Sequence, residues 1–149
     1  MKKPLRLLTR FGQKRPNFWI AAWIAWFITL WLLSSGNPAP KDLPPIPHLD
    51  KVAHFGFFFG GAGLLCAWLR HYFKKLNTFQ CIWITTLVGS LVGILDEYHQ
   101  SFTPGRTGND VYDWIADSAG SFAGAIVMIA LLKATSTWSA NRQKTQEPI

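Results

Sequence analysis

The chain alternates between long apolar blocks and short polar segments. An α-helix needs about 20 predominantly apolar residues, and no fewer than about 17, to cross the hydrocarbon core of a bilayer. The blocks that reach or approach this length cover residues 18–33, 52–69, 79–95 and 115–132. Extended by their less apolar flanks, they predict four transmembrane helices at about residues 18–35, 50–70, 79–100 and 110–132.

The predicted fold class is all-α, a polytopic membrane protein built as a four-transmembrane-helix bundle. The alternative is a soluble protein with four buried helices, but a chain of 149 residues has no second layer to surround helices that are apolar all round. We expect one transmembrane domain over residues 18–134, between a basic tail at 1–17 and a polar tail at 135–149. The first block resembles a signal peptide in its basic flank, but its length and the absence of an A-x-A pattern favour a retained anchor.

Composition agrees with a membrane protein. The chain is 49% hydrophobic and contains eight Trp and eleven Phe. Its two cysteines, Cys66 and Cys81, lie in or near apolar blocks and belong to no metal motif, so we interpret them as small hydrophobic residues.

Charged residues sort by segment, which predicts the orientation. The N-terminal tail and the connection after the second block, with Arg70, Lys74 and Lys75, contain bases but no acids. Apart from Asp117 and Glu147, the acids fall near the other two connections. The positive-inside rule therefore predicts that both termini and the connection after the second block face the cytoplasm. The net charge of +7 then reflects topology and attraction to lipid headgroups, and no nucleic-acid motif is present.

The third predicted helix ends outside with two adjacent acids, Asp96 and Glu97. A helix C-terminus is the negative end of the helix dipole, so carboxylates there need a partner. Gln100 follows Glu97 by three residues and Asp96 by four, which lets either pair converge on one ligand. The alternative is a solvated helix end with both acids in water.

The second predicted helix contributes Asp50 and His54, which are four residues apart and share one helix face. Asp50 is interpreted either as a helix N-cap or as the partner of His54. His54 lies one turn inside the apolar block. Its role there is either functional, as a partner of Asp50, or purely structural.

The fourth predicted helix begins with acids in one stripe. Asp110, Asp113 and Asp117 are spaced at i, i+3 and i+7. An N-cap and first-turn acids near the positive helix end explain the first two. Asp117 lies about 10 Å deeper, at 1.5 Å of rise per residue, and an intramembrane acid calls for a partner. We expect that partner to be His54 or Arg106.

Arg106 follows the Pro104-Gly105 turn signal and is the only base in this acidic connection. Arginine suits bidentate contacts with carboxylates or phosphates, so we expect Arg106 to be the counter-ion of Asp96, Glu97 or the acids that follow. A structural ion pair that orders the connection is the alternative.

Small residues at G-x-x-x-G spacing predict close helix packing. They occur in the second, third and fourth predicted helices, as Gly56 and Gly60, Gly89 and Gly93, and Gly120 and Gly124. These three helices should form the tight core that gathers the polar side chains. The first helix lacks the pattern, and its tryptophans indicate a peripheral helix anchored at the interface.

Taken together, these motifs resemble the VanZ-like family of bacterial integral membrane proteins. The resemblance covers roughly residues 49 to 132. It rests on Asp50-Lys51-x-x-His54, Asp96-Glu97-x-x-Gln100, Pro104-Gly105-Arg106 and Asp113-x-x-x-Asp117-x-x-Gly120. Many family members carry Asn at the position of Asp117. Because the family takes its name from a protein linked to teicoplanin resistance, the resemblance implies a role in the cell envelope.

Three functions are compatible with these residues. The favoured one is a non-enzymatic envelope protein whose outward-facing pocket binds a cell-wall precursor or glycopeptide and contributes to teicoplanin-type resistance. The second is a membrane enzyme with Glu97 or Asp96 as base, His54 as acid–base partner and Arg106 as a clamp. The third is a proton-coupled carrier that uses His54 and Asp117. No internal repeat supports it.

We expect the polar pocket to be formed by one set of residues, namely Asp50, His54, Asp96, Glu97, Gln100, Arg106, Asp110, Asp113 and Asp117. No cofactor is expected. Oxygen and nitrogen ligands at this spacing also suit a divalent metal, but no motif specifies one. The expected partner is the lipid bilayer, and the sequence leaves the oligomeric state open.

Overall fold

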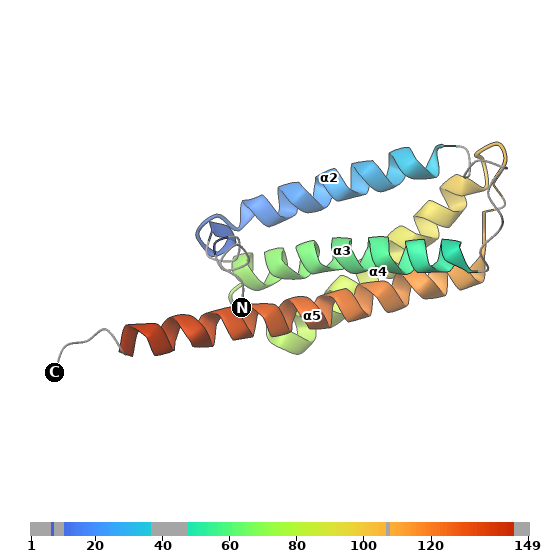
Figure 1. The fold of residues 1–149 in the computed structure, drawn as a ribbon. Helices are drawn as coiled ribbons and strands as arrows, with labels where there is room; N and C mark the ends of the chain where they lie inside the picture. The colour runs from blue at the N-terminus through green and yellow to red at the C-terminus, as the bar shows by residue number, and fades with distance from the viewer. Residues whose placement is uncertain (1–6, 8–10, 37–47, 107, 145–149) are drawn as a thin grey trace.

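The computed structural model describes residues 7, 11–36, 48–106 and 108–144, with side chains through residue 135. Four long helices dominate this part of the chain, as Figure 1 shows: α2 (Asn17–Ser34), α3 (Leu49–Tyr72), α4 (Thr78–Gln100) and α5 (Val111–Lys144). Each contains a stretch long and apolar enough to cross a membrane; in α5 this is Val111–Thr135. The all-helical fold with four candidate spans is therefore confirmed.

Helix boundaries agree with the predicted ones to within two residues, with one exception. The fourth helix was predicted to end at residue 132, before a polar tail, but α5 continues to Lys144. The segment between contains Thr, Ser, Trp, Ala, Asn, Arg, Gln and Lys, with neither Gly nor Pro to stop a helix. Loss of hydrophobicity therefore marked the end of the span but not the end of the helix. Residues 44–47, which bring three prolines before the second predicted helix, lie outside the described residues.

The helices run alternately up and down, which gives the bundle two distinct ends. In Figure 1, α3 and α5 lie side by side, α2 lies against α3, and α4 packs against both α5 and α3. The ends of α2 and α4 and the starts of α3 and α5 meet at one end, which we call the acid end. The starts of α2 and α4 and the end of α3 meet at the opposite end, which we call the basic end.

Glycines set the closest helix contacts. On α5, Gly120 and Gly124 face the backbone carbonyls of Phe55 and Phe59, so a Cβ at either position would collide with α3. On α4, Gly93 lies directly against Asp117, whose Oδ2 is 2.7 Å from the place a Cβ would occupy. These contacts confirm that small residues allow close approach on α4 and α5.

The corresponding prediction for α3 is wrong. Gly56 and Gly60 face open space, and the faces of α3 that pack tightly carry Gly61 and Gly63. Because α5 supplies the glycines at this contact, α3 can present its own backbone at Phe55 there. On the α3 side, Gly63 also faces α5, where a Cβ would lie 3.4 Å from Cε of Met128.

The first span, α2, is integrated into the bundle more closely than its composition indicated. Trp26 packs on Gly61 and donates from Nε1 to the carbonyl of Phe57 at 3.0 Å. Trp19 is almost fully buried, so interfacial anchoring does not describe it. Both Cys66 and Cys81 are free thiols buried in the core, as expected of small hydrophobic residues.

Candidate functional site

Side chains from all four described spans meet at the acid end. Asp96, Glu97 and Gln100 on α4 are each at least nine-tenths buried, and Asp117 on α5 is fully buried. The predicted three-helix pocket is incomplete, because α2 adds the buried Ser34. Burying this many ionisable groups is unfavourable unless they are paired or hydrogen-bonded, so their partners define the site.

The first partnership joins His54 to Asp117. The His54 ring lies on α3 with Nδ1 3.0 Å from Oδ1 of Asp117 on α5. The other ring nitrogen, Nε2, lies 3.9 Å from Oδ2 of Asp113. The predicted pairing is therefore present. When Asp117 is ionised it can only accept, so Nδ1 then donates at this contact, and Nε2 faces Asp113.

The second partnership is centred on Lys51. Its ammonium lies 2.9 Å from Asp50, 2.5 Å from Asp110 and 2.9 Å from Asp113. An ammonium has three donors, so three carboxylates from α3 and the start of α5 match it. The two acids from the start of α5 are thereby tied to α3. Asp113 stands between two bases, with one oxygen toward Lys51 and the other toward His54.

Asp96 and Glu97 differ from these acids because neutral donors hold them. Ser34 donates its hydroxyl to Oδ1 of Asp96, and Gln100 donates from Nε2 to Oδ2 at 2.7 Å. Glu97 accepts from the backbone N–H of Asp110 through Oε2, at 2.7 Å. Its other oxygen, Oε1, is buried and has no hydrogen-bond partner among the described residues. The same holds for Oδ2 of Asp117.

The predicted role of Arg106 as carboxylate counter-ion is wrong. Arg106 donates to the carbonyls of Leu33 at 3.0 Å and Gly36 at 3.2 Å, at the end of α2. A third donation, at 3.2 Å, goes to Oε1 of Gln100, which itself donates to Asp96. Free carbonyls at the negative end of a helix attract a guanidinium. Arg106 thus fastens the α4–α5 connection to α2 and reaches Asp96 only through an amide.

Asp110 and Asp50 were both predicted near helix starts, but only Asp110 caps a helix. Asp110 caps α5 by accepting from the backbone N–H of Tyr112 at 2.8 Å, as predicted. The neighbouring Lys51 ammonium holds the pKa of Asp110 below its ordinary value. Asp50 is neither an N-cap nor the partner of His54. The residue before α3 is His48, and Asp50 is an exposed side chain that contacts Lys51.

A small cavity opens beside these groups. Its volume is about 130 Å³. Its polar lining comes from α2, α3, α4 and the α4–α5 connection, and comprises Ser34, His54, Asp96, Gln100 and Arg106. Apolar side chains such as Leu30 and Phe58 line the rest. The cavity therefore combines hydrogen-bond donors and acceptors, including an acid and a base, with an apolar wall.

Among the described residues, two sets of side chains have ligand atoms close enough together to hold a metal ion. Within each set the atoms lie within 4.8 Å of one another. One set consists of Asp50, Asp110 and Asp113, but these already surround the Lys51 ammonium. The other is His54 with Asp96 and Glu97. Imidazole with two carboxylates suits a divalent transition metal, so only the second set is a credible metal site.

Sequence reasoning missed two residues of the site, Lys51 and Ser34. Lys51 follows Asp50 directly and precedes His54 by three residues, which places it one helical turn from that ring. That spacing was an available signal. Ser34 had no comparable signal, because its contact with Asp96 joins residues that are 62 positions apart.

A family model described as VanZ/LLP1 matches residues 4–133, which includes the four spans and the whole acid end. Neither the curated proteins nor the solved structures include a match to this chain.

Proposed function

This chain belongs to the VanZ/LLP1 family, and from that premise we propose that it is a multi-pass envelope protein whose acid end binds a small polar group. The group is the donor-bearing part of an envelope lipid or a lipid-linked cell-wall precursor. In this proposal the acid end faces outward, and contribution to teicoplanin-type resistance follows from holding that envelope component.

Unpaired buried carboxylate oxygens carry the proposal. Oε1 of Glu97 and Oδ2 of Asp117 are buried acceptors with no hydrogen-bond partner among the described residues. An unsatisfied buried acceptor costs about 1–3 kcal/mol, and more when it is charged. A ligand that donates hydrogen bonds, such as a hydroxyl-rich or amino-bearing headgroup, would recover that free energy. The electrostatics of the acid end therefore favour a donor or cation and disfavour an anion.

The size of the cavity limits what can enter. Pockets for drug-sized molecules usually have about 300–1,000 Å³, and this one has about 130 Å³. It can hold a headgroup fragment but not an entire glycopeptide. This supports an envelope component as the ligand in preference to the antibiotic itself.

A membrane enzyme is the second candidate, favoured by the surroundings of His54. The ring is oriented by Asp117 at 3.0 Å, and one of its nitrogens lies within 4.8 Å of ligand atoms of Asp96 and Glu97. An imidazole fixed by one carboxylate beside a second acid can exchange protons with a substrate. Glu97 or Asp96 would act as base, with or without a divalent metal held by the same three side chains.

The experiment is a substitution scan in a teicoplanin-susceptible bacterium that carries the chain. We expect Glu97→Gln, Asp96→Asn and His54→Gln to remove the protection given by the wild-type chain. Lys75→Gln, a surface change at the basic end, should leave it intact. Immunoblots of membrane fractions keep protein abundance comparable.

The same scan separates the two candidates. Purified Glu97→Gln that still retains the ligand but no longer converts it would favour the enzyme. Loss of retention together with protection would favour binding alone. Full protection by all three acid-end variants would contradict both functions.

A further inference from the structure

At the basic end, far from the acid end, we propose a second binding site that takes a phosphate-bearing anion. The site is a cavity of about 410 Å³ where α3, α4 and α5 meet the segment before α2. It shares no residue with the acid end, so the proposal is independent of the function assigned there.

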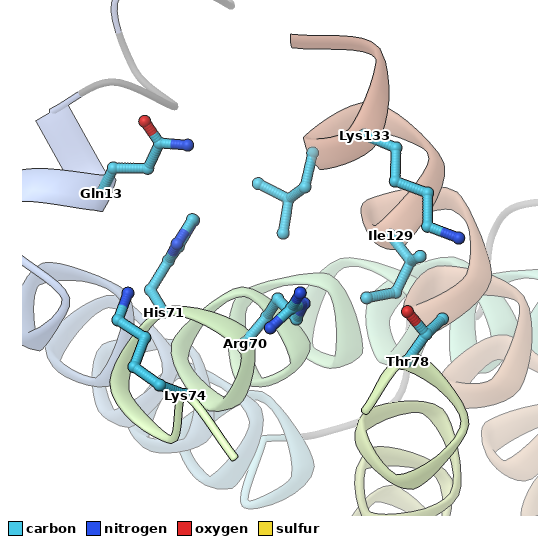
Figure 2. Close-up of a pocket in the computed structure, with 8 residues that line it drawn as sticks. Gln13, Arg70, His71, Lys74, Thr78, Ile129 and Lys133 are labelled. Atoms are coloured by element: carbon cyan, nitrogen blue, oxygen red, sulfur yellow. The ribbon is translucent and has the colours of Figure 1, made fainter. Parts of the chain in front are cut away.

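The lining of this cavity is one-sided in charge. Figure 2 shows Arg70 and His71, from the end of α3, across the open space from Ile129 and Lys133 on α5. Lys74 from the α3–α4 connection and Gln13 from the N-terminal segment complete the rim. No Asp or Glu is among the described residues that line it. Several donors and no carboxylate make a site that favours an anion.

His71 distinguishes this cavity from a patch of exposed basic side chains, because its imidazole is buried. Its side chain is only 7% exposed, yet its Nε2 is buried without a hydrogen-bond partner among the described residues. The ring stacks on Trp19 with centroids 6.5 Å apart, which fixes its position. His71 lines the cavity, and its unpaired imidazole nitrogen is a hydrogen-bonding group that a ligand held there would satisfy.

Two further features suit a phosphate group. Arg70 offers a planar guanidinium whose donors match the spacing of phosphate oxygens. Thr78, which also lines the cavity, is the first residue of α4, a helix of 23 residues whose N-terminus is the positive end of its dipole. Together they offer hydrogen-bond donors from a side chain and from a helix start.

The phosphate can come from a lipid headgroup or from free phosphate. Two buried apolar side chains of α5, Ile129 and Leu132, line the cavity next to the charged rim. Both sources share the same recognition chemistry, so the experiment must separate them.

The test uses the full-length protein purified in detergent. Native mass spectrometry measures retention of dioleoylphosphatidylglycerol, with dioleoylphosphatidylcholine as the zwitterionic comparison. Calorimetric titration with inorganic phosphate measures binding of the free anion. We expect Arg70→Gln to weaken binding about tenfold or more, the effect of losing one charge-assisted hydrogen bond.

Two variants serve as matched comparisons. Lys75→Gln removes an exposed charge from the same connection but outside the cavity, and should change binding less than about twofold. His71→Phe keeps an aromatic ring against Trp19 but removes the nitrogen. We expect it to weaken binding while the thermal unfolding midpoint stays close to that of wild type.

Each outcome bears on the proposal. Lipid retention that phosphate does not displace identifies a headgroup site, and phosphate binding without selective lipid retention identifies a free-anion site. Equal losses in Lys75→Gln and Arg70→Gln would show that only general surface charge acts, and would overturn the proposal. So would wild-type binding by Arg70→Gln and His71→Phe, or binding of neither probe.

Discussion

Lys51 is the residue on which the charge balance of the acid end depends. It contacts three carboxylates and is only 23% exposed in its side chain. Exposed ion pairs contribute about 0–1 kcal/mol, whereas breaking a buried one costs about 3–5 kcal/mol. The exposure of Lys51 places it between these limits.

We therefore predict that Lys51→Met lowers the free energy of unfolding by about 2 kcal/mol, because Asp113 is left buried beside another acid. Thermal or denaturant unfolding in a fixed detergent measures this change. Lys75→Met, which removes an exposed Lys at the opposite end, is the control. Equal stability of the two variants would show that Lys51 is no more than a surface charge.

His54 and Asp117 form a coupled pair whose energetics a double-mutant cycle can isolate. His54→Ala leaves Asp117 fully buried without its partner, while Asp117→Asn removes the charge that His54 meets. We predict that the double variant is more stable than the sum of the single losses by about 1–2 kcal/mol. Additive losses would mean that the two side chains do not interact.

At the residue scale, the sequence predicted pairs of side chains that lie at similar depth in neighbouring spans. It did not predict pairs that depend on the path of a connection between helices. His54 and Asp117 each lie one or two turns inside spans that start at the same end, so their meeting was predictable. Arg106 lies in the α4–α5 connection and donates to carbonyls at the end of α2. No pattern near Arg106 indicates that this connection passes beside α2. Its partners could not be predicted.

At the element scale, the contact between α3 and α5 holds the site together, because it sets the distance between His54 and Asp117. Gly120 and Gly124 permit that contact. Gly56, on α3, is also a glycine, but it faces open space. The two glycine positions therefore provide a matched pair for testing whether close approach matters.

We predict that Gly124→Ala destabilises the protein by about 1–3 kcal/mol, since its Cβ would strike the carbonyl of Phe59. Gly56→Ala should be neutral or stabilising by up to about 1 kcal/mol, from helix propensity alone. Unfolding midpoints of both variants in the same detergent decide the matter. Similar changes in the two would remove the case for glycine-mediated packing.

Helix existence was predictable because each span is a long apolar block, and length alone settles what can cross a bilayer. The faces of those helices were not. The α2, α3 and α4 spans are apolar nearly all round, so no stripe indicates which side packs inward. This is why the tight stripe on α3 was assigned to Gly56 and Gly60 when the packed positions are Gly61 and Gly63.

At the scale of the whole molecule, charge separates along the bundle axis. Acids gather at one end and bases at the other, and the positive-inside rule relates this separation to orientation. We predict that a membrane-impermeant maleimide labels Phe102→Cys but not Lys75→Cys in intact cells. Cys66 and Cys81 are buried and give little background. Labelling at residue 75 alone would reverse the orientation.

The central claim is that the acid end holds a donor-bearing envelope component through Glu97 and its neighbours. Quantifying the lipids and precursors that copurify with the protein tests it most directly. Glu97→Gln is compared with wild type and with Glu147→Gln, the same change at the only other Glu in the chain. We expect wild type and Glu147→Gln to retain a hydroxyl- or amino-rich species, and Glu97→Gln to retain about tenfold less of it. Identical copurifying species in all three proteins would contradict it.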